Sequence, residues 1–495
     1  MSIYIIFFLI LAALPLRAAV RCRTGIYSGC EEDGVLCFRG IPYAQSPVGS
    51  LRFRPAEPLA PGNRSYDAVR CGDASLQPAP TPNRQSEDCL WLNLWTSKNA
   101  HHSPKPVMVF VHGGAFVTDS AAMDIYSCAG LAKSFPDMVF VSVEYRLGLL
   151  GFGDFRSLEG LAGEACPVPG ISDVICALTW IRDNAEAFGG DPDRVTLFGQ
   201  SAGAVIISLL PLFSEARPLF RRMILQSGSP SLVMTPEKAA AALSSFMRQT
   251  GCGSREDLER LPDEAFRTFA ECAPVLGCGA LPDTIGEIYA RAAEPACTDK
   301  DLMTGTNTDE MDYFVMLMGR DRGRRLQEKA HARRLALLPP ELRRRAEAVY
   351  SPERFPDPAE AACRFAGDAL FHIPARTLLQ ARPGGRSYLY SFRIPSGKPG
   401  VRACHAVELS YVFGTSRYGY GGRDMDMGIS RRMQELWTSF ARCGRPVSQS
   451  LEAPEYASGR LLAIDPEGLR TEKAAPVPEG PEALAFVPIL DAGLM

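Results

Sequence analysis

Residues 195–210 (VTLFGQSAGAVIISLL) are the part of the sequence that most restricts the fold. The first four residues predict a buried strand, and the last seven predict an apolar helix. Between them, Gly199-Gln200-Ser201-Ala202-Gly203 leaves room only for a sharp turn. Such a turn forces the serine into a strained backbone conformation and exposes its hydroxyl above the edge of a sheet. We therefore interpret Ser201 as a nucleophile. The alternative is a glycine-rich turn with an idle serine.

Two further apolar segments predict the centre of this sheet. Residues 107–114 (VMVFVHGG) and 138–146 (MVFVSVEYR) are rich in β-branched residues, as buried parallel strands are. Residues 173–186 have apolar side chains at helical spacing and precede the strand before Ser201. This order predicts an α/β-hydrolase fold, with a large, mostly parallel twisted sheet covered by helices on both faces. No repeat or linker divides the chain, so we expect a single domain over residues 20–495.

The first 16 residues, MSIYIIFFLILAALPL, are almost wholly apolar. They predict a signal peptide over residues 1–19 and a secreted or periplasmic protein. No Lys or Arg precedes the apolar run, and Arg17 interrupts the small-residue pattern of a cleavage site. A buried N-terminal strand or an uncleaved anchor is therefore the alternative. No later segment has the pattern of a membrane helix, so we expect no span in the mature chain.

The net charge and the cysteines restrict the binding partners, the cellular compartment and the cofactors that we expect. The net charge of −3 gives no indication of a nucleic-acid partner. The 15 cysteines favour an oxidising compartment, and their odd number leaves at least one thiol outside an intrachain disulfide. No Cys/His cluster has the spacing of a zinc site, so we expect neither a metal nor a cofactor.

A serine that transfers acyl groups needs at least two N–H donors directed at the tetrahedral oxyanion. The residue after the nucleophile, Ala202, is expected to supply one of them. The glycine-rich residues 112–116 (HGGAF) follow an earlier strand and are expected to supply another. They lack the lysine and the spacing of a phosphate-binding loop. A plain turn is the alternative interpretation.

Three histidines follow Ser201 and are candidates for the general base, which comes last in this fold. His331 lies in a charged helical segment, and His372 lies between apolar residues. His405 follows a loop rich in Gly and Pro and precedes an apolar helical run. We predict His405 as the base, because such a loop can reach over the sheet edge.

The acid that orients the base is harder to assign. Residues 302–314 (LMTGTNTDEMDYF) contain Asp309, Glu310 and Asp312 just after a predicted strand. Any of them can accept the Nδ1–H bond of a histidine and fix its tautomer. The residue types alone do not rank the three.

Ordered segments along most of the chain resemble the type-B carboxylesterase/cholinesterase family. They run from about residue 25 to the last helix before the C-terminus. Besides HGGAF they are FRGIPYAQSPVGSLRF (38–53), SEDCLWLNLW (86–95), YRLGLLGF (145–152), AFGGDPDRVTLFGQSAGA (187–204), ILQSGSP (224–230), GTNTDE (305–310) and ACHAVELSYVFG (403–414).

The resemblance implies roles for individual residues. It implies that Glu310 is the acid, that His405 is the base, and that Gly114, Ala115 and Ala202 supply the oxyanion N–H groups. It also implies several supporting contacts, which are a Ser227 hydroxyl on the glutamate, a Cys71–Cys89 disulfide, and buried salt bridges Arg52–Glu87 and Arg146–Asp173. A second family disulfide from Cys252 to Cys272 or to Cys278, or to neither, stays open.

The chain departs from the family pattern at three positions near the predicted site. Gln200 stands where relatives usually have Glu, and Ala115 where they usually have a third Gly. Neither change removes a backbone donor. Glu144 replaces the more usual Asn, and the sequence offers no explanation for it. Residues 71–89 contain no Trp on which a choline cation could stack, so selective choline-ester hydrolysis is not expected.

Together these features predict a serine carboxylic ester hydrolase that cleaves small to medium acyl esters through a Ser-Glu-His acyl-enzyme mechanism. Its partner is a small-molecule ester, and the sequence does not indicate an oligomeric state. A catalytically inactive adhesion module is one alternative, but such relatives typically lack a triad residue. A lipase is another, and it would carry a large apolar lid that the sequence does not reveal.

Overall fold

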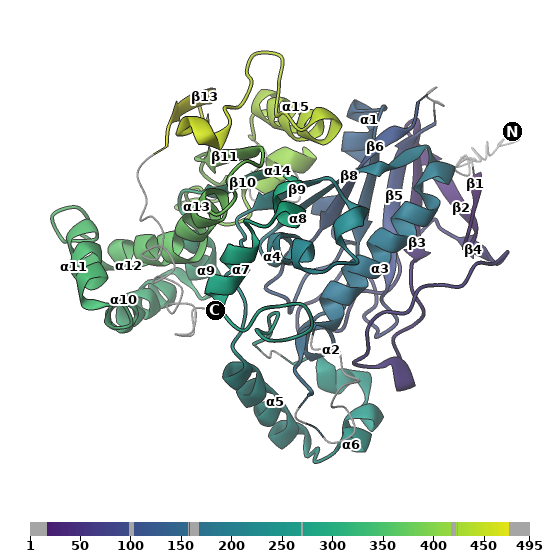
Figure 1. The fold of residues 1–495 in the computed structure, drawn as a ribbon, viewed down its shortest axis with the longest axis horizontal. Coiled ribbons are helices and arrows are strands. Elements are labelled where there is room, and N and C mark those ends of the chain that lie inside the picture. The colour runs from purple at the N-terminus through teal and green to yellow at the C-terminus, as the bar shows by residue number, and fades with distance from the viewer. Residues whose placement is uncertain are drawn as a thin grey trace, which may run out of the picture.

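The computed structural model describes residues 17–98, 103–156, 158, 168–268, 271–416, 422 and 424–474. These residues form a 13-stranded sheet in the order β1-β2-β3-β5-β7-β6-β8-β9-β10-β11-β12-β13, with β4 paired to β2 (Figure 1). The strands are β1 (Arg17–Cys22), β2 (Gly25–Glu32), β3 (Val35–Pro42), β4 (Ser65–Asp67), β5 (Trp91–Ser97), β6 (Lys105–Val111), β7 (Val139–Val143), β8 (Gly190–Gln200), β9 (Arg222–Gln226), β10 (Asp301–Asn307), β11 (Ser387–Phe392), β12 (Arg460–Asp465) and β13 (Gly468–Lys473).

The centre of the sheet is parallel. Every neighbouring pair from β7 to β12 in the sheet order is parallel, whereas the pairs β1–β2, β2–β3, β3–β5, β5–β7 and β12–β13 are antiparallel. Strands β6, β7 and β8 are those predicted from the apolar segments. The side chains of β6 and β7, and those of β8 from Val195 onward, are buried on both faces, as expected when helices cover both faces of a parallel sheet.

Helices cover the two faces. The helices are α1 (Ala129–Ser134), α2 (Gly148–Phe152), α3 (Pro169–Asn184), α4 (Ala202–Leu209), α5 (Pro236–Thr250), α6 (Arg255–Arg260), α7 (Ile285–Arg291), α8 (Pro295–Thr298), α9 (Met311–Leu317), α10 (Arg320–Ala336), α11 (Pro340–Val349), α12 (Pro358–Gly367), α13 (Ile373–Gln380), α14 (Glu408–Phe413) and α15 (Met427–Cys443).

Successive side chains of β6 point to opposite faces of the sheet, and each face has its own hydrophobic core. Val107, Val109 and Val111 pack in one core with α3 and α4, whereas Met108 and Phe110 pack in the other with α1, α14 and α15. A smaller core joins α9 to α12 and lies to one side of the sheet (Figure 1). The predicted α/β-hydrolase architecture is therefore confirmed.

Helix α15 illustrates how the sequence sets an element. Asp426 caps its N-terminus by accepting hydrogen bonds from the N–H groups of Gly428 and Ile429. Gly444 ends it in the left-handed conformation, with φ of 75°. The apolar residues between them, including Met433 and Trp437, recur at helical spacing and are buried against the sheet.

The two predicted buried salt bridges are confirmed. Arg146 Nη2 lies 2.6 Å from Asp173 Oδ1, with both side chains almost fully buried. Arg52 pairs with Glu87, and its Nε donates to Oε2 at 2.9 Å.

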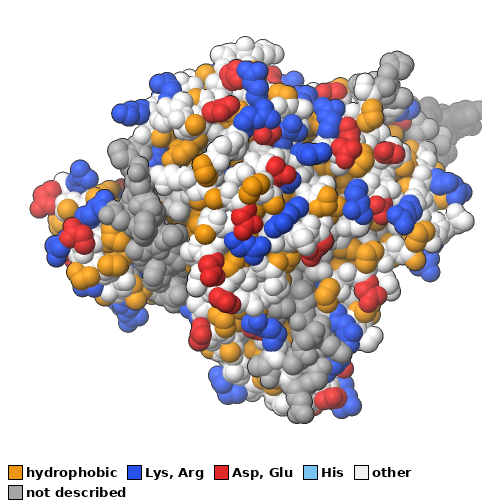
Figure 2. All heavy atoms as spheres, in the orientation of Figure 1, with side chains coloured by type: hydrophobic (Ala, Val, Ile, Leu, Met, Phe, Trp, Pro, Cys, Tyr) orange, Lys and Arg blue, Asp and Glu red, His pale blue; other side chains and the backbone are white. Residues whose placement is uncertain are grey.

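On the face shown in Figure 2, basic and acidic side chains are interspersed, which agrees with the small net charge.

The predicted Cys71–Cys89 disulfide is wrong, because both residues are free thiols. The Cys71 thiol faces the side chain of Asn93, and the buried Cys89 thiol faces that of Ser75. Each thiol thus has a polar partner of its own, and the two are not bonded to each other. Cys252 is also a thiol, so neither of its two candidate disulfides forms.

The predicted signal peptide falls mostly outside the described residues. Residues 17–19 are the first half of β1 and pair with residues 28–30 of β2. Across the part of the chain that is described, the helices are too short or too polar to cross a membrane.

Candidate active site

Ser201 lies in the turn between β8 and α4. Its φ of 54° and ψ of −124° are the strained conformation that the sequence predicts at this turn. Its backbone N–H donates to the carbonyl of Gln226 at 2.8 Å. A Cβ at Gly203 would lie 2.0 Å from the carbonyl oxygen of Val111, so only glycine lets α4 pack this close to β6. The turn leaves the serine half-buried, with no hydrogen bond from its hydroxyl to any described residue.

The oxyanion loop, residues 112–121, follows β6 and lies against this turn. A Cβ at Gly113 would lie 3.3 Å from the Cβ of Ser201, which measures how close the loop comes to this serine. Within the described chain, the N–H groups of Gly114, Ala115 and Ala202 have no hydrogen-bond acceptor. Three unpaired donors beside one serine are what an oxyanion needs.

His405 and Glu310 are in direct contact at the same end of the sheet. Nδ1 of His405 lies 2.6 Å from Oε2 of Glu310, and both side chains are buried. Glu310 comes shortly after β10, and His405 comes from the loop that follows β11. Because a carboxylate only accepts, Nδ1 carries the proton, and Nε2 is left as the acceptor that a general base requires.

Two hydrogen bonds fix the other oxygen of Glu310. The Ser227 hydroxyl donates to Oε1 at 2.6 Å, and the backbone N–H of Asn307 donates to the same atom at 2.8 Å. Both donors stand at the ends of neighbouring strands, β9 and β10. The contact of Ser227 is the one implied by the family resemblance.

The structure separates the three acidic candidates that the residue types could not rank. Asp309 and Asp312 pair with Arg402, at 3.1 Å and 3.0 Å. Glu310 alone of the three contacts His405. The carboxylate that orients the histidine is therefore distinguished by its surroundings and not by its type.

The other two histidines have different partners. His372 lies 2.6 Å from Asp368 through Nδ1 and 2.8 Å from the carbonyl oxygen of Asn307 through Nε2, so both nitrogens are occupied. Its pKa is raised by the Asp368 carboxylate, which outweighs burial. The ring of His331 packs against Phe365, with 5.1 Å between centroids.

Sequence reasoning missed a second buried carboxylate beside Glu310. Glu408 accepts hydrogen bonds from the side-chain amides of Gln226 at 3.1 Å and Asn307 at 2.5 Å. Burial raises its pKa, and the nearby charge of Glu310 acts in the same direction. Its place three residues after His405, at the start of the predicted apolar helical run, was the available signal.

Sequence reasoning also missed the aromatic flank of His405. The rings of Phe314 and Phe371 lie 5.2 Å and 4.9 Å from the imidazole, and Tyr313 lies 5.9 Å from it. These side chains make one side of the site apolar.

Among the described residues, no group of three or more His, Cys, Asp or Glu is arranged to hold a metal ion.

A strained serine between a parallel strand and a helix, beside a histidine–carboxylate pair and unpaired N–H groups, defines the α/β-hydrolase class. Residues 18–474 match the sequence profile of the Carboxylesterase family. The chain belongs to this family.

Three proteins that are similar to this chain in sequence or structure are two esterases and a hydrolase. The chain is 32% identical to the para-nitrobenzyl esterase of Bacillus subtilis (strain 168) over 90% of its length and 95% of that protein. It is 30% identical to the phenmedipham hydrolase of Pseudarthrobacter oxydans over 91% of its own length and 96% of that protein. The carboxylesterase structure of Geobacillus stearothermophilus matches with a TM-score of 0.80 and 29% identity, over 94% of this chain and 99% of that one. The chain is a carboxylic ester hydrolase.

Proposed function

We propose that the protein hydrolyses small to medium acyl esters, with Ser201 as nucleophile, His405 as general base and Glu310 as the acid of the triad. The single observation that carries this proposal is the 2.6 Å contact between His405 Nδ1 and Glu310 Oε2. It fixes the tautomer in which Nε2 accepts a proton, beside the turn that presents Ser201.

Acylation begins when Nε2 of His405 takes the Ser201 proton as the hydroxyl oxygen attacks the ester carbonyl. Glu310 stabilises the resulting imidazolium, and Ser227 with the Asn307 N–H keeps the carboxylate in place. The carbonyl oxygen becomes an oxyanion that the unpaired N–H groups of the oxyanion loop and Ala202 stabilise. The C–O bond to the alcohol then breaks, and the alcohol leaves with the proton from His405.

Deacylation repeats these steps with water. His405 takes a proton from a water molecule that attacks the acyl-enzyme carbonyl, and the Ser201 oxygen leaves with that proton. The chemistry requires no group beyond the side chains and N–H donors already described.

The apolar flank of the site supports the substrate class. Phe314 and Phe371 lie beside the imidazole that must face the scissile ester. Aromatic rings favour contact with an apolar acyl or alcohol group over a charged one. Esters with short and medium acyl chains fit this description.

The test is hydrolysis of p-nitrophenyl esters from acetate to palmitate by the wild type and by Ser201→Ala. We expect turnover with short and medium chains, and its loss in the variant. A matched control is Ser229→Ala, whose hydroxyl contacts Ser231 and not the triad. A wild type that turns over no ester and takes up no fluorophosphonate probe would refute the proposal.

We further propose that the chain is exported, on the strength of its apolar N-terminal residues 1–16. Cleavage after Ala19 would leave residues 20–22 as the remainder of β1. N-terminal sequencing of the protein recovered outside the cytoplasm tests this proposal. Recovery of the whole intact chain from the cytoplasm alone would contradict it.

A further inference from the structure

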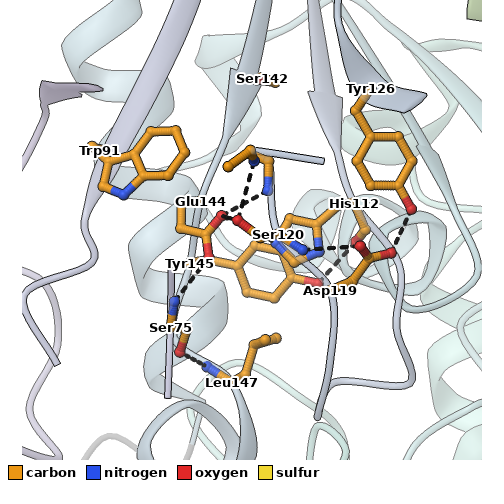
Figure 3. Close-up of polar contacts among 12 residues, drawn as sticks. Ser75, Trp91, His112, Asp119, Ser120, Tyr126, Ser142, Glu144, Tyr145 and Leu147 are labelled. Carbon is orange, nitrogen blue, oxygen red and sulfur yellow. Dashed lines mark hydrogen bonds and ion pairs between the residues drawn. The ribbon is translucent and has the colours of Figure 1, made fainter. Parts of the chain in front are cut away.

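Glu144 is a fully buried carboxylate behind the oxyanion loop, directly after β7 (Figure 3). Its Oε1 accepts a hydrogen bond from the N–H of Ser75 at 3.0 Å. Its Oε2 accepts from the Ser120 hydroxyl at 2.8 Å and from the N–H of Ala121 at 2.7 Å. The side chain therefore ties the last two residues of the oxyanion loop to a separate segment of the chain.

The first residue of the same loop also faces Glu144. Nε2 of the fully buried His112 lies 3.9 Å from Oε2 of Glu144, and its Nδ1 lies 3.0 Å from the carbonyl oxygen of Gly113. The imidazole stacks on Tyr145, with 4.4 Å between ring centroids. Burial lowers the pKa of His112, so this contact joins a neutral ring to a carboxyl group and is not an ion pair.

We propose that Glu144 is a positioning residue for the oxyanion loop, that it acts through hydrogen bonds at both of its carboxyl oxygens, and that its working form is the neutral acid. This inference rests on the proposed ester hydrolysis. Through Ser120, Ala121 and His112 it reaches both ends of the loop that carries Gly114 and Ala115. These two residues supply N–H donors, so a small displacement of the loop moves them away from the oxyanion.

The surroundings of Glu144 favour the neutral acid. Burial raises its pKa to about 8, although three hydrogen bonds oppose this shift. The charged or titratable groups around it are Asp119, His112, Tyr145, Cys71 and Cys89. Asp119 is an acid that raises the pKa further, and burial keeps the tyrosine and both thiols neutral. Arg146, two residues after Glu144, is paired with Asp173.

A neutral acid preserves the contacts that hold the loop. Oε1 still accepts from the N–H of Ser75, and Oε2 still accepts from that of Ala121. The direction of the 2.8 Å contact with Ser120 reverses: the Ser120 hydroxyl donates to a carboxylate, whereas the neutral acid donates its Oε2 proton to the Ser120 oxygen. Glutamine cannot replace these contacts. Its NH₂ group would have to occupy the position of one of the two oxygens, where it would face the backbone N–H of Ser75 or of Ala121, and two donors cannot bond each other.

Ionisation of Glu144 opposes the reaction. A carboxylate there would place a negative charge behind the N–H groups that must stabilise a second negative charge in the transition state. The neutral form dominates below the pKa of about 8, and the charged form dominates above it. The value of kcat should therefore fall as pH rises through this range.

The experiment compares wild type, Glu144→Gln and Ser120→Ala in kcat and KM for p-nitrophenyl acetate between pH 6 and 9.5, with active sites counted by fluorophosphonate labelling. In Glu144→Gln we expect kcat at pH 7 to fall about tenfold or more, because the donors of the loop are displaced. We expect KM to stay within about twofold, and the fall of kcat above pH 8 to disappear. Ser120→Ala should lower kcat less. Glu87→Gln, another buried glutamate, is the control that should lower Tm without changing the pH profile.

Unchanged kcat and an unchanged alkaline fall in Glu144→Gln would overturn the inference while leaving the ester hydrolase intact. If that variant does not fold, the pH profile of the wild type is the test. A wild-type kcat that stays level up to pH 9.5 would overturn the inference. A wild type without any turnover would instead refute the proposed function itself.

Discussion

The side-chain nitrogen of Gln200 lies 2.9 Å from Nε2 of His405. In the proposed mechanism, this is the ring nitrogen that accepts the Ser201 proton. Since an amide nitrogen only donates, the contact agrees with the tautomer set by Glu310, but it occupies the acceptor in the resting site. The Ser201 hydroxyl has to displace this amide before it can transfer its proton.

Replacing Gln200 by Glu should move the acid limb of kcat/KM to higher pH. A carboxylate at this position favours the imidazolium, so the base form of the histidine is reached only at higher pH. We expect a displacement of about one pH unit in profiles measured with p-nitrophenyl acetate. Gln85→Glu adds the same charge away from the histidine and should leave the profile unchanged. Superimposable profiles for Gln200→Glu and wild type would show that the amide does not face the working base.

Removing the Ser227 hydroxyl should slow catalysis without unfolding the protein. Its 2.6 Å hydrogen bond is one of the two that Oε1 of Glu310 accepts. Hydrogen bonds to charged groups contribute about 1.5–3 kcal/mol, so kcat/KM in Ser227→Ala should fall about tenfold or more. Ser229→Ala is the matched control, because Ser229 bonds Ser231 instead. Equal kcat/KM in the two variants would contradict a supporting role for Ser227.

The central strands and the nucleophile turn could be predicted from the sequence because local pattern decides them. The runs of β6, β7 and β8 are apolar on both faces, and the glycines around Ser201 are compatible with little but a sharp turn. His405 was selected from its loop, and the structure places it against Glu310, while its role as base stays a prediction. Ranking Glu310 over its acidic neighbours needed the positions of Arg402 and His405, which lie about 90 residues away in the chain.

The environment of Glu144 could not be predicted, for the same physical reason. Its partners come from Ser75, about 70 residues before it, and from Ser120 and Ala121. No periodicity links such separated segments. The disulfide prediction failed because family spacing says nothing about side-chain direction, and Asn93 and Ser75 face the two sulfurs in this chain.

Breaking the salt bridge of Asp173 should destabilise the fold strongly. Its carboxylate accepts hydrogen bonds from the backbone N–H, Nε and Nη2 of Arg146, all of them buried. Asp173→Asn leaves a buried guanidinium without a counter-charge, so the free energy of unfolding should fall by about 3–5 kcal/mol. Asp183→Asn is the control, because its partner Arg23 is 58% exposed and the loss should stay within about 1 kcal/mol. Urea denaturation of both variants measures the difference, and similar losses would contradict the assignment.

Replacing Ala115 by Gly should stabilise the oxyanion loop while keeping the N–H donor. Ala115 has φ of 54°, a left-handed conformation that costs an L-residue about 1–2 kcal/mol. Glycine removes this cost but loses more conformational entropy on folding, so we expect a net gain of about 0.5–1 kcal/mol in the free energy of unfolding. Since the backbone N–H remains, kcat should stay within about twofold. Ala132→Gly in the helix α1 is the opposite control and should lose about 1 kcal/mol. Urea denaturation reports the stability, and a loss in Ala115→Gly as large as in Ala132→Gly would show that the loop does not hold Ala115 in a strained conformation.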